Sequence, residues 1–329
     1  MVPPDVKLSA LSVLSPALHS LVQRSMVEPA SLAAELHASP LAAIAPMMPM
    51  RVHGNASTSF PIVVAHGMGD SCFNPGMDSV TKYAGKTLNT YAVCIPTASS
   101  QIMDTIAGFL KNMDASVDEF AKRVRSDPKL AGGFNAFGLS QGNNLIRGYI
   151  TKYNDPPVNA FISICGINAG VAAFPQCSPQ TPLLGGICKA VTELLGSLAY
   201  NPIVQSILFQ ANYFRDPTKV NTTAYKSYSQ LAKWNGESGA DMSAYKANWA
   251  KTNSFTWVEG TEDTVVWPRE GEQWGELPDT YPTELKALPM KRARWYTSDS
   301  FGLRTADEAG KVHFESFAGE HIRFSDSDL

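Results

Sequence analysis

The sequence predicts an α/β fold with a mostly parallel central sheet and helices on both of its faces. From residue 60 onward, short β-branched runs alternate with segments of helical spacing. Strands that are separated by helices pair in parallel, because the chain crosses back over the sheet before the next strand begins. Between about residues 168 and 250, mostly helical patterns interrupt the alternation. They predict a lid-like helical insertion over the carboxyl ends of the strands.

The individual elements follow in chain order. A first strand is predicted over residues 60–68. A segment of helical spacing follows over residues 74–89. A second strand over 90–97 precedes a long helical segment over 99–129. Further strands are predicted over residues 133–140, 159–167, 253–261, 292–299 and 312–317.

The composition is that of a globular protein and excludes several classes. Of the 329 residues, 44% are hydrophobic and 17% are charged, which suits one large α/β domain or two smaller ones. The net charge is -3 and the basic residues are scattered, so nucleic acid is not an expected partner. No window reaches the roughly 18 consecutive apolar residues of a transmembrane helix. We therefore expect a soluble protein that makes at most transient contact with a membrane surface.

The first 59 residues differ from the rest of the chain. They are rich in Ala, Ser, Pro, Leu and Met, and they lack the basic start and compact apolar run of a secretory signal. We interpret residues 1–59 as an N-terminal extension that is a leader or propeptide. The alternative is two short amphipathic helices that pack on the body. Residues 60–329 are predicted to form the α/β domain, with the insertion at about 168–250.

The run Gly138-Leu139-Ser140-Gln141-Gly142 carries the first chemical signal. A G-x-S-x-G motif between a strand and a helix is typical of a nucleophile elbow, in which the serine Oγ projects from a strained turn. Two glycines leave room for such a turn. The alternative is a glycine-rich turn with a capping serine, so Ser140 needs catalytic partners before it is assigned as a nucleophile.

The first partner required is a base, and a neutral imidazole suits that task. In an α/β-hydrolase the catalytic residues occur in the order serine, acid, histidine. Of the six histidines, only His313 and His321 follow Ser140. Alternation places His313 within a strand, whereas His321 lies on the loop after that strand. We therefore assign His321 as the base, with a solvent-facing loop histidine as the alternative.

The acid is expected in the loop after the strand 253–261. Asp263 lies at the centre of this loop, where its carboxylate can accept the Nδ1–H of the histidine and fix the tautomer. Glu262 competes next door, but adjacent side chains diverge in an extended loop. Glu259 falls too early, within the strand. Asp263 is therefore the predicted acid.

Two backbone N–H groups are needed to stabilise an oxyanion. The residue after the serine, Gln141, supplies one, and the loop "AHGMGDS" after the first strand is of the kind that supplies the other in lipases and esterases. The predicted donors are the N–H groups of Met68 and Gln141. A strand-ending turn is the alternative for His66 and Gly67.

These motifs together resemble the palmitoyl-protein thioesterase family over roughly residues 60–329. The resemblance rests on the oxyanion loop, the elbow, the acid loop and the histidine motif, at residues 66–77, 127–144, 263–268 and 319–325. It departs from the family at Asn143 and Asn144, where similar sequences often have another glycine.

The resemblance implies an α/β-hydrolase that releases long-chain fatty acids from S-acylated cysteines. It implies Ser140, Asp263 and His321 as the catalytic triad, Met68 and Gln141 as oxyanion donors, and no metal or cofactor. The family is lysosomal or secreted. The alternatives are a lipase or carboxylesterase that acts on oxygen esters, and a secreted lipid-binding protein on the same scaffold without catalysis.

Residues 174–217 resemble the acyl-binding helical region of that family. One helical face there offers Ile203, Val204, Ile207, Leu208 and Ala211. Of these, Ile203, Ile207 and Leu208 are the predicted acyl contacts, although such stripes also form ordinary core.

The chain has five cysteines. The resemblance implies a disulfide between Cys177 and Cys188, which is consistent with an oxidising compartment. Cys72 and Cys94 are candidates for a second bridge, and Cys165, in an apolar strand, is expected to be a buried thiol. No CxxC pair is present, so no zinc site is expected. The N-glycosylation tripeptides that begin at Asn55 and Asn221 are candidate sites.

Overall fold

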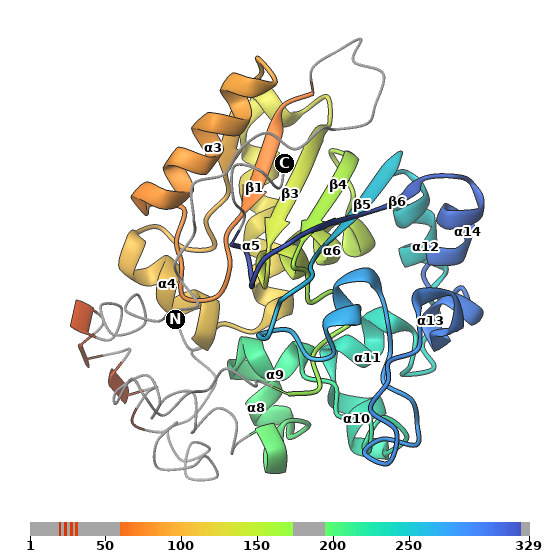
Figure 1. The fold of residues 1–329 in the computed structure, drawn as a ribbon. Helices are drawn as coiled ribbons and strands as arrows, with labels where there is room; N and C mark the ends of the chain where they lie inside the picture. Colours follow the sequence, from red (N-terminus) through yellow and green to blue (C-terminus); the bar gives the residue numbers. More distant parts are fainter. Residues whose placement is uncertain are drawn as a thin grey trace.

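The structure is a computed structural model that describes residues 60–173 and 195–323, together with a few residues between 20 and 31. At its centre, one six-stranded sheet has the order β2-β1-β3-β4-β5-β6, and all neighbouring strands are parallel (Figure 1). This confirms the predicted α/β-hydrolase architecture. The strands are β1 Ile62–Ala65, β2 Ala92–Cys94, β3 Phe134–Leu139, β4 Val158–Ile164, β5 Ser254–Gly260 and β6 Val312–Phe317.

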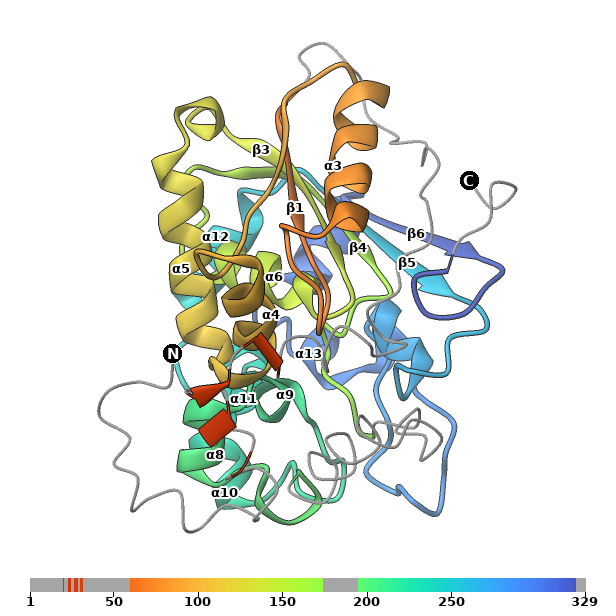
Figure 2. The same cartoon turned by 90° about the vertical axis from the view of Figure 1, so that its left-hand side faces the viewer.

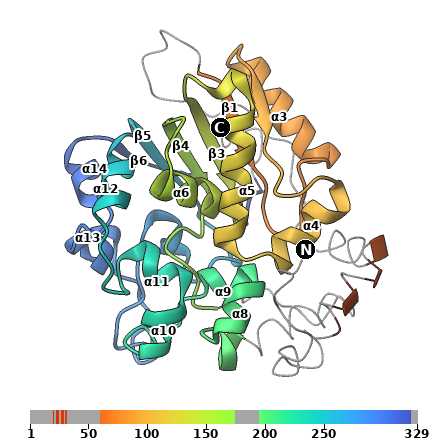
Figure 3. The same ribbon diagram turned by 180° about the vertical axis from the view of Figure 1, so that it is seen from behind.

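The central strands bury side chains on both faces of the sheet. In β1, Val63 and Ala65 join one apolar cluster while Ile62 and Val64 join another. Such strands read as continuous apolar runs because helices cover both sides. The two faces are visible in Figures 1 and 3. The first cluster includes residues of α5 Met113–Ser126, α6 Gly142–Lys152 and α12 Ser243–Ala250, and the second includes residues of α3 Pro75–Thr87.

The helical segment predicted over 99–129 forms two helices, α4 (Gln101–Leu110) and α5, followed by the short 3-10 helix η3 (Pro128–Leu130). The chain is extended at Asn112 between them, with φ -61° and ψ 155°. The Asn112 side chain accepts a hydrogen bond from the N–H of Ala115 and so begins α5. A good N-cap residue thus divides one continuous helical pattern.

The insertion forms short helices at the carboxyl end of the sheet (Figure 2). Helical spacing over 201–214 predicts one helix, but the chain is extended at Leu208, where ψ is 115°. Gln205 stabilises this break, because its Nε2 donates to the carbonyl oxygens of Ala199 and Ala211, both at 2.7 Å. The lid helices are α8 Pro202–Ile207, α9 Phe209–Tyr213, α10 Thr223–Tyr228 and α11 Gln230–Asn235.

The strand predicted over 292–299 is wrong. This segment follows the 3-10 helix η5 (Met290–Arg292) and forms α13 (Arg294–Thr297), with α14 (Leu303–Glu308) after it. Trp295 and Tyr296 are adjacent and both are buried, which a strand covered on one face does not allow. The indole of Trp295 also donates to the carbonyl oxygen of Trp274 at 3.1 Å. Tertiary packing overrides the strand preference of these aromatic residues.

Some predictions fall outside the described residues. These are most of the extension 1–59, the glycosylation candidate Asn55 and the disulfide between Cys177 and Cys188. The domain boundaries stay predictions. Among the described residues, no helix has the length and apolar character needed to cross a membrane.

Candidate active site

Ser140 stands at the sharp turn between β3 and α6. Its φ is +51°, in the left-handed region that non-glycine residues seldom adopt, and its N–H donates to the carbonyl oxygen of Ile164 at 3.0 Å. Its side chain is largely buried. The turn therefore holds the hydroxyl in a strained, fixed position at the carboxyl end of the sheet.

Close contacts with neighbouring atoms explain both glycines of the elbow. A Cβ at Gly138 would lie 2.4 Å from Oδ1 of Asn143, and a Cβ at Gly142 would lie 2.3 Å from the carbonyl oxygen of Ala65. Asn143 braces the turn, since its Nδ2 donates to the carbonyl oxygens of Ser140 and Ile164, both at 3.0 Å. The departure from the family pattern at Asn143 thus has a local structural purpose.

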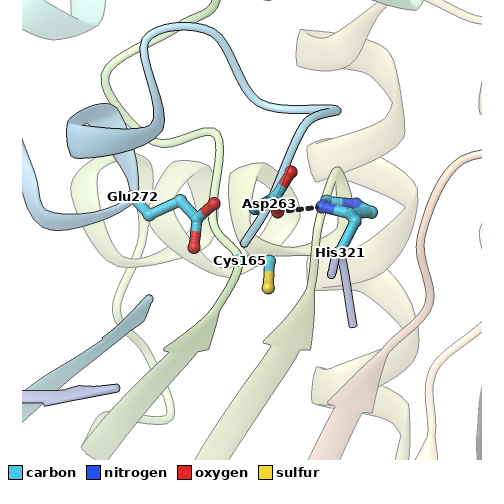
Figure 4. Close-up of side chains that lie close together, drawn as sticks. All are labelled: Cys165, Asp263, Glu272 and His321. Atoms are coloured by element: carbon cyan, nitrogen blue, oxygen red, sulfur yellow. Dashed lines mark hydrogen bonds and ion pairs between the residues drawn. The ribbon is translucent and has the colours of Figure 1, made fainter. Parts of the chain in front are cut away.

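His321 lies on the loop after β6 and contacts both other members of the predicted triad. Its Nε2 is 2.8 Å from Oγ of Ser140, and its Nδ1 is 2.5 Å from Oδ2 of Asp263 (Figure 4 draws the latter contact). An ionised carboxylate only accepts, so Nδ1 carries the proton and the lone pair of Nε2 faces the serine hydroxyl. The three residues therefore form one hydrogen-bonded chain.

Asp263 is held as a carboxylate by its surroundings. Its Oδ1 accepts the N–H groups of Val265 at 2.7 Å and Val266 at 3.0 Å. Burial alone would raise the pKa of Asp263, but the hydrogen bond and charge of His321 lower that pKa to about 2. The competing acids face elsewhere: Glu262 is exposed, and Glu259 lies in β5 and pairs with Arg269 at 3.0 Å.

The acid loop and the histidine loop are joined directly. Hydrogen bonds link Thr264 to the Glu320 carboxylate, at 3.0 to 3.2 Å, and the N–H of Glu262 to the carbonyl oxygen of Gly319 at 3.0 Å. Cys165, the predicted buried free thiol, anchors the same loop by accepting the N–H of Ile322 at 3.3 Å. These contacts fix His321 relative to Asp263.

The two predicted oxyanion donors lie near the elbow and are braced by the lid helix α9. Among the described residues, neither the N–H of Met68 nor that of Gln141 donates to a backbone carbonyl. The side chain of Gln141 donates to the carbonyl oxygen of Gly108 at 2.8 Å and accepts from Nε2 of Gln210 at 3.0 Å. The Tyr213 hydroxyl lies 3.8 Å from the sulfur of Met68.

Sequence reasoning missed Asp104, which forms a buried ion pair with His66. The Nε2 of His66 lies 3.1 Å from Oδ2 of Asp104, and Nδ1 lies 2.9 Å from the carbonyl oxygen of Gly67. Burial would lower the pKa of His66, but the charge of Asp104 raises it to about 9. His66 is therefore an imidazolium that stabilises the loop. No pattern marks Asp104, because it lies within the ordinary helical spacing of α4.

The oxyanion loop has two further attachments. Asp104 also accepts the N–H of Cys72 at 3.0 Å and the N–H of Thr97 at 2.6 Å. A disulfide joins Cys72 to Cys94 at the end of β2, which confirms the candidate pairing of these two cysteines. The loop after β1 is thus tied to the next strand by a covalent bond and a buried carboxylate.

The predicted acyl contacts differ in accessibility. Ile207 and Leu208 are completely buried in an apolar cluster between α4 and the lid helices. Ile203 is partly exposed and packs against this cluster, as do Met68, Ile102 and Leu198. Only the partly exposed members can touch a bound ligand without rearrangement.

Two groups of described residues bring metal-ligand types together. Cys165, Asp263, Glu272 and His321 place one ligand atom each within 4.8 Å of one another, and so do His66, Cys72 and Asp104. In the first group Asp263 and His321 bond to each other, and in the second the Cys72 sulfur is in a disulfide.

Comparison with known proteins identifies similar sequences. A family model described as "Palmitoyl protein thioesterase" matches residues 61–321. Palmitoyl-protein thioesterase 1 of Caenorhabditis elegans is 31% identical over 84% of this chain and 90% of its own length. Palmitoyl-protein thioesterase 3 of Dictyostelium discoideum is 29% identical over 80% of this chain and 86% of its own. Lysosomal thioesterase PPT2 of Bos taurus is 24% identical, over 77% of each chain.

We predict that Gly142→Ala destabilises the protein and displaces the elbow. The added methyl group would overlap the carbonyl oxygens of Ala65 and His66, at 2.3 and 2.6 Å, and backbone atoms there have little freedom to move. We expect a loss of about 1–3 kcal/mol in the free energy of unfolding. Chemical denaturation measures it. Gly76→Ala in α3 is the control, because a Cβ there meets nothing within 4 Å, and equal stability of the two variants would contradict the prediction.

Proposed function

The chain belongs to the palmitoyl protein thioesterase family, and from that premise we propose that it removes long-chain fatty acyl groups from S-acylated cysteines. It is a thioester hydrolase. The observation that carries the finer proposal is the hydrogen-bonded chain from Ser140 through His321 to Asp263. In this chain, Nδ1 of His321 faces Asp263 and Nε2 faces the Ser140 hydroxyl, which is the arrangement that nucleophilic catalysis by serine requires.

In the proposed first step, Oγ of Ser140 attacks the thioester carbonyl carbon while Nε2 of His321 takes the hydroxyl proton. Asp263 stabilises the imidazolium through its bond to Nδ1. The carbonyl oxygen becomes an oxyanion that accepts the N–H groups of Met68 and Gln141. Collapse of this intermediate breaks the carbon–sulfur bond, releases the cysteine thiolate, and leaves an acyl ester on Ser140.

In the second step, water attacks the acyl ester. Nε2 of His321 takes a proton from the attacking water to form a second tetrahedral intermediate. As that intermediate collapses, Nε2 gives the proton to the Ser140 oxygen, the bond between that oxygen and the acyl carbon breaks, and the fatty acid departs. The proton taken up in the first step leaves with the thiol or the solvent. No redox group takes part in either step.

The leaving group explains why this machinery suits a thioester. A cysteine thiol has a pKa near 8.5, so it departs as a thiolate with little help, whereas an alkoxide needs a firm general acid. The triad alone does not distinguish thioesters from the oxygen esters of a lipase or carboxylesterase. Family membership favours thioesters, and the complete triad argues against a binding protein without catalysis.

The acyl chain is proposed to lie along the partly exposed rim of the apolar cluster. Ile203, Met68, Ile102 and Leu198 supply this rim, and Met68 connects it to the proposed oxyanion site. Ile207 and Leu208 form the wall behind. The lid would then determine which acyl chain lengths are preferred, at a distance from the residues that carry out the chemical step.

A lysosomal or secreted location is proposed on two grounds. The bovine relative is named as a lysosomal thioesterase, and a disulfide joins Cys72 to Cys94. The glycosylation candidate Asn221 is exposed just before α10, with Thr222 as the N-cap of that helix, so the acceptor side chain is accessible. The proposed partners are S-acylated proteins or peptides.

Ser140→Ala is expected to abolish turnover without unfolding the protein, because the deleted Oγ is the atom that carries the acyl group. A fluorophosphonate probe should label Ser140 in the unsubstituted protein and nothing in the variant. Hydrolysis of a palmitoyl thioester and mass spectrometry of the labelled peptide test both points. Label on another serine, or surviving activity, would overturn the proposed nucleophile.

Asp263→Asn is expected to lower kcat on the order of 10⁴-fold, because an amide holds the imidazole in the wrong tautomer. Glu262→Gln is the matched control on the adjacent exposed residue and should leave kcat nearly unchanged. Steady-state kinetics on the same thioester compare the two. A large effect at Glu262 with a small one at Asp263 would reassign the acid.

Ile203→Asp is expected to lower kcat/KM for palmitoyl thioesters far more than for butyryl thioesters. Each methylene that an apolar site buries contributes about 0.8 kcal/mol, so long chains depend most on the rim. Leu208→Ala is the contrast, since loss of this buried side chain should cost about 2–5 kcal/mol of stability and depress all substrates together. A flat chain-length profile for the unsubstituted protein would contradict the long-chain assignment.

A further inference from the structure

A second buried carboxyl group lies beside the proposed triad. Glu272 is completely buried on the 3-10 helix η4 (Arg269–Gln273), which follows the acid loop. Its Oε2 accepts the N–H of Gly260, the last residue of β5, at 3.0 Å. Its Oε1 is also buried, and no N–H or O–H donor reaches it among the described residues. A buried, ionised carboxylate with one oxygen that accepts no hydrogen bond would be energetically unfavourable.

Asp263 is a close charged neighbour of Glu272. Ligand atoms of Glu272, Asp263, Cys165 and His321 all lie within 4.8 Å of one another. Figure 4 shows the Glu272 carboxyl turned toward Asp263, on the side opposite His321. Two buried carboxyl groups so close together do not both ionise, because the mutual repulsion in a poorly solvated site is too large. One of them must hold a proton.

The contacts decide which group holds it. Asp263 accepts hydrogen bonds from Val265, Val266 and His321, all of which favour its anion. Among the residues that the structure describes, Glu272 accepts one backbone N–H and forms no ion pair with a Lys or Arg side chain. Burial, followed by the charge of Asp263, raises the pKa of Glu272 well above its usual value. Glu272 is therefore a neutral acid at neutral pH, and its proton needs an acceptor.

The acceptor at hand is the Asp263 carboxylate. A carboxylate offers about four lone pairs, and three of those on Asp263 are used by Val265, Val266 and His321. We propose that Glu272 is a positioning residue whose carboxyl O–H donates to the fourth, and so keeps Oδ2 of Asp263 aimed at Nδ1 of His321. This inference rests on the proposed function. It extends the chain of the triad by one member that never touches the substrate.

The proposal has a pH dependence with a defined sign. The groups that face Glu272 are Asp263, His321 and Cys165, together with Glu259, whose charge is paired with Arg269. When Glu272 loses its proton, its donated hydrogen bond is replaced by repulsion of Asp263. Activity should therefore decline on the alkaline side as Glu272 ionises.

The free energy of unfolding should also depend on the protonation of Glu272. The pKa of Glu272 is higher in the folded protein than the 4.5 of the unfolded chain, so folding retains a proton that unfolding releases. Its favourable contribution is complete below about pH 4.5 and falls as pH rises toward the folded-state pKa. A variant without the Glu272 carboxyl group should not show this dependence of stability on pH.

Two substitutions separate positioning from simple packing. Glu272→Gln keeps an acceptor for the Gly260 N–H and supplies an amide N–H that can donate to Asp263, but it cannot ionise. Glu272→Met keeps the length and volume and removes both functions. Glu270→Gln, on an exposed residue of the same 3-10 helix, is the control.

We expect Glu272→Gln to retain most of kcat and to lose the alkaline decline. Glu272→Met should lower kcat roughly 10- to 100-fold, the equivalent of a lost hydrogen bond to a charged group, with little change in KM. The rate of fluorophosphonate labelling of Ser140 should fall in parallel. Stability measured against pH should be flatter for the Gln variant than for the unsubstituted protein.

The outcomes that overturn the inference are distinct from those that overturn the proposed function. Equal kcat for the Gln and Met variants, or an unchanged alkaline limb in the Gln variant, would reject the donated hydrogen bond. A loss of melting temperature in both variants with normal kcat would reduce Glu272 to a packing role and also reject it. Absence of label on Ser140 in the unsubstituted protein would instead reject the triad itself.

Discussion

The contact between the elbow and the end of β1 is the constraint on which the site depends. The Gly142 backbone lies so close to the carbonyl oxygens of Ala65 and His66 that no Cβ fits between them. Two residues earlier, Ser140 adopts its positive φ of +51°, and a Cβ at Gly67, next to Met68, would lie 3.5 Å from the Cβ of Ser140. The parallel register of β3, β5 and β6 then delivers Asp263 and His321 to the same end of the sheet. The contact thus holds the elbow against the end of β1, where the loop that carries Met68 begins.

Two histidine–carboxylate pairs in the protein have opposite chemical characters because of what surrounds each ring. Both nitrogens of His66 face acceptors, the carbonyl oxygen of Gly67 and the carboxylate of Asp104, so the ring holds two protons and keeps its charge. His321 faces an acceptor only at Nδ1, while Nε2 meets a hydroxyl that can donate. The first ring is a fixed positive charge that binds a loop in place. The second ring presents Nε2 to the hydroxyl of Ser140.

The sequence was sufficient for features that local pattern and chain order determine. Glycine spacing identified the elbow, chain order selected His321 over His313, and divergence of adjacent side chains favoured Asp263 over Glu262; the structure joins Ser140, His321 and Asp263 by hydrogen bonds and leaves Glu262 exposed. Features that depend on contacts between residues far apart in the chain could not be predicted from the sequence. The strand predicted over 292–299 is helical because Trp295 packs on Trp274, and the break at Leu208 depends on the side chain of Gln205. Asp104 and Glu272 are ordinary acids in sequence, and only burial beside His66 and Asp263 gives them a role.

The lid and the proposed oxyanion site are one packed unit rather than two neighbouring parts. Helix α9 supplies Gln210, whose Nε2 donates both to the carbonyl oxygen of Gly108 and to the side chain of Gln141. The same helix supplies Tyr213, whose hydroxyl meets the sulfur of Met68. Between these contacts, α9 buries Ala211 in the apolar cluster that includes Ile207 and Leu208. Movement of this cluster would therefore also move Met68 and Gln141, so the apolar cluster and the proposed oxyanion site are linked through α9.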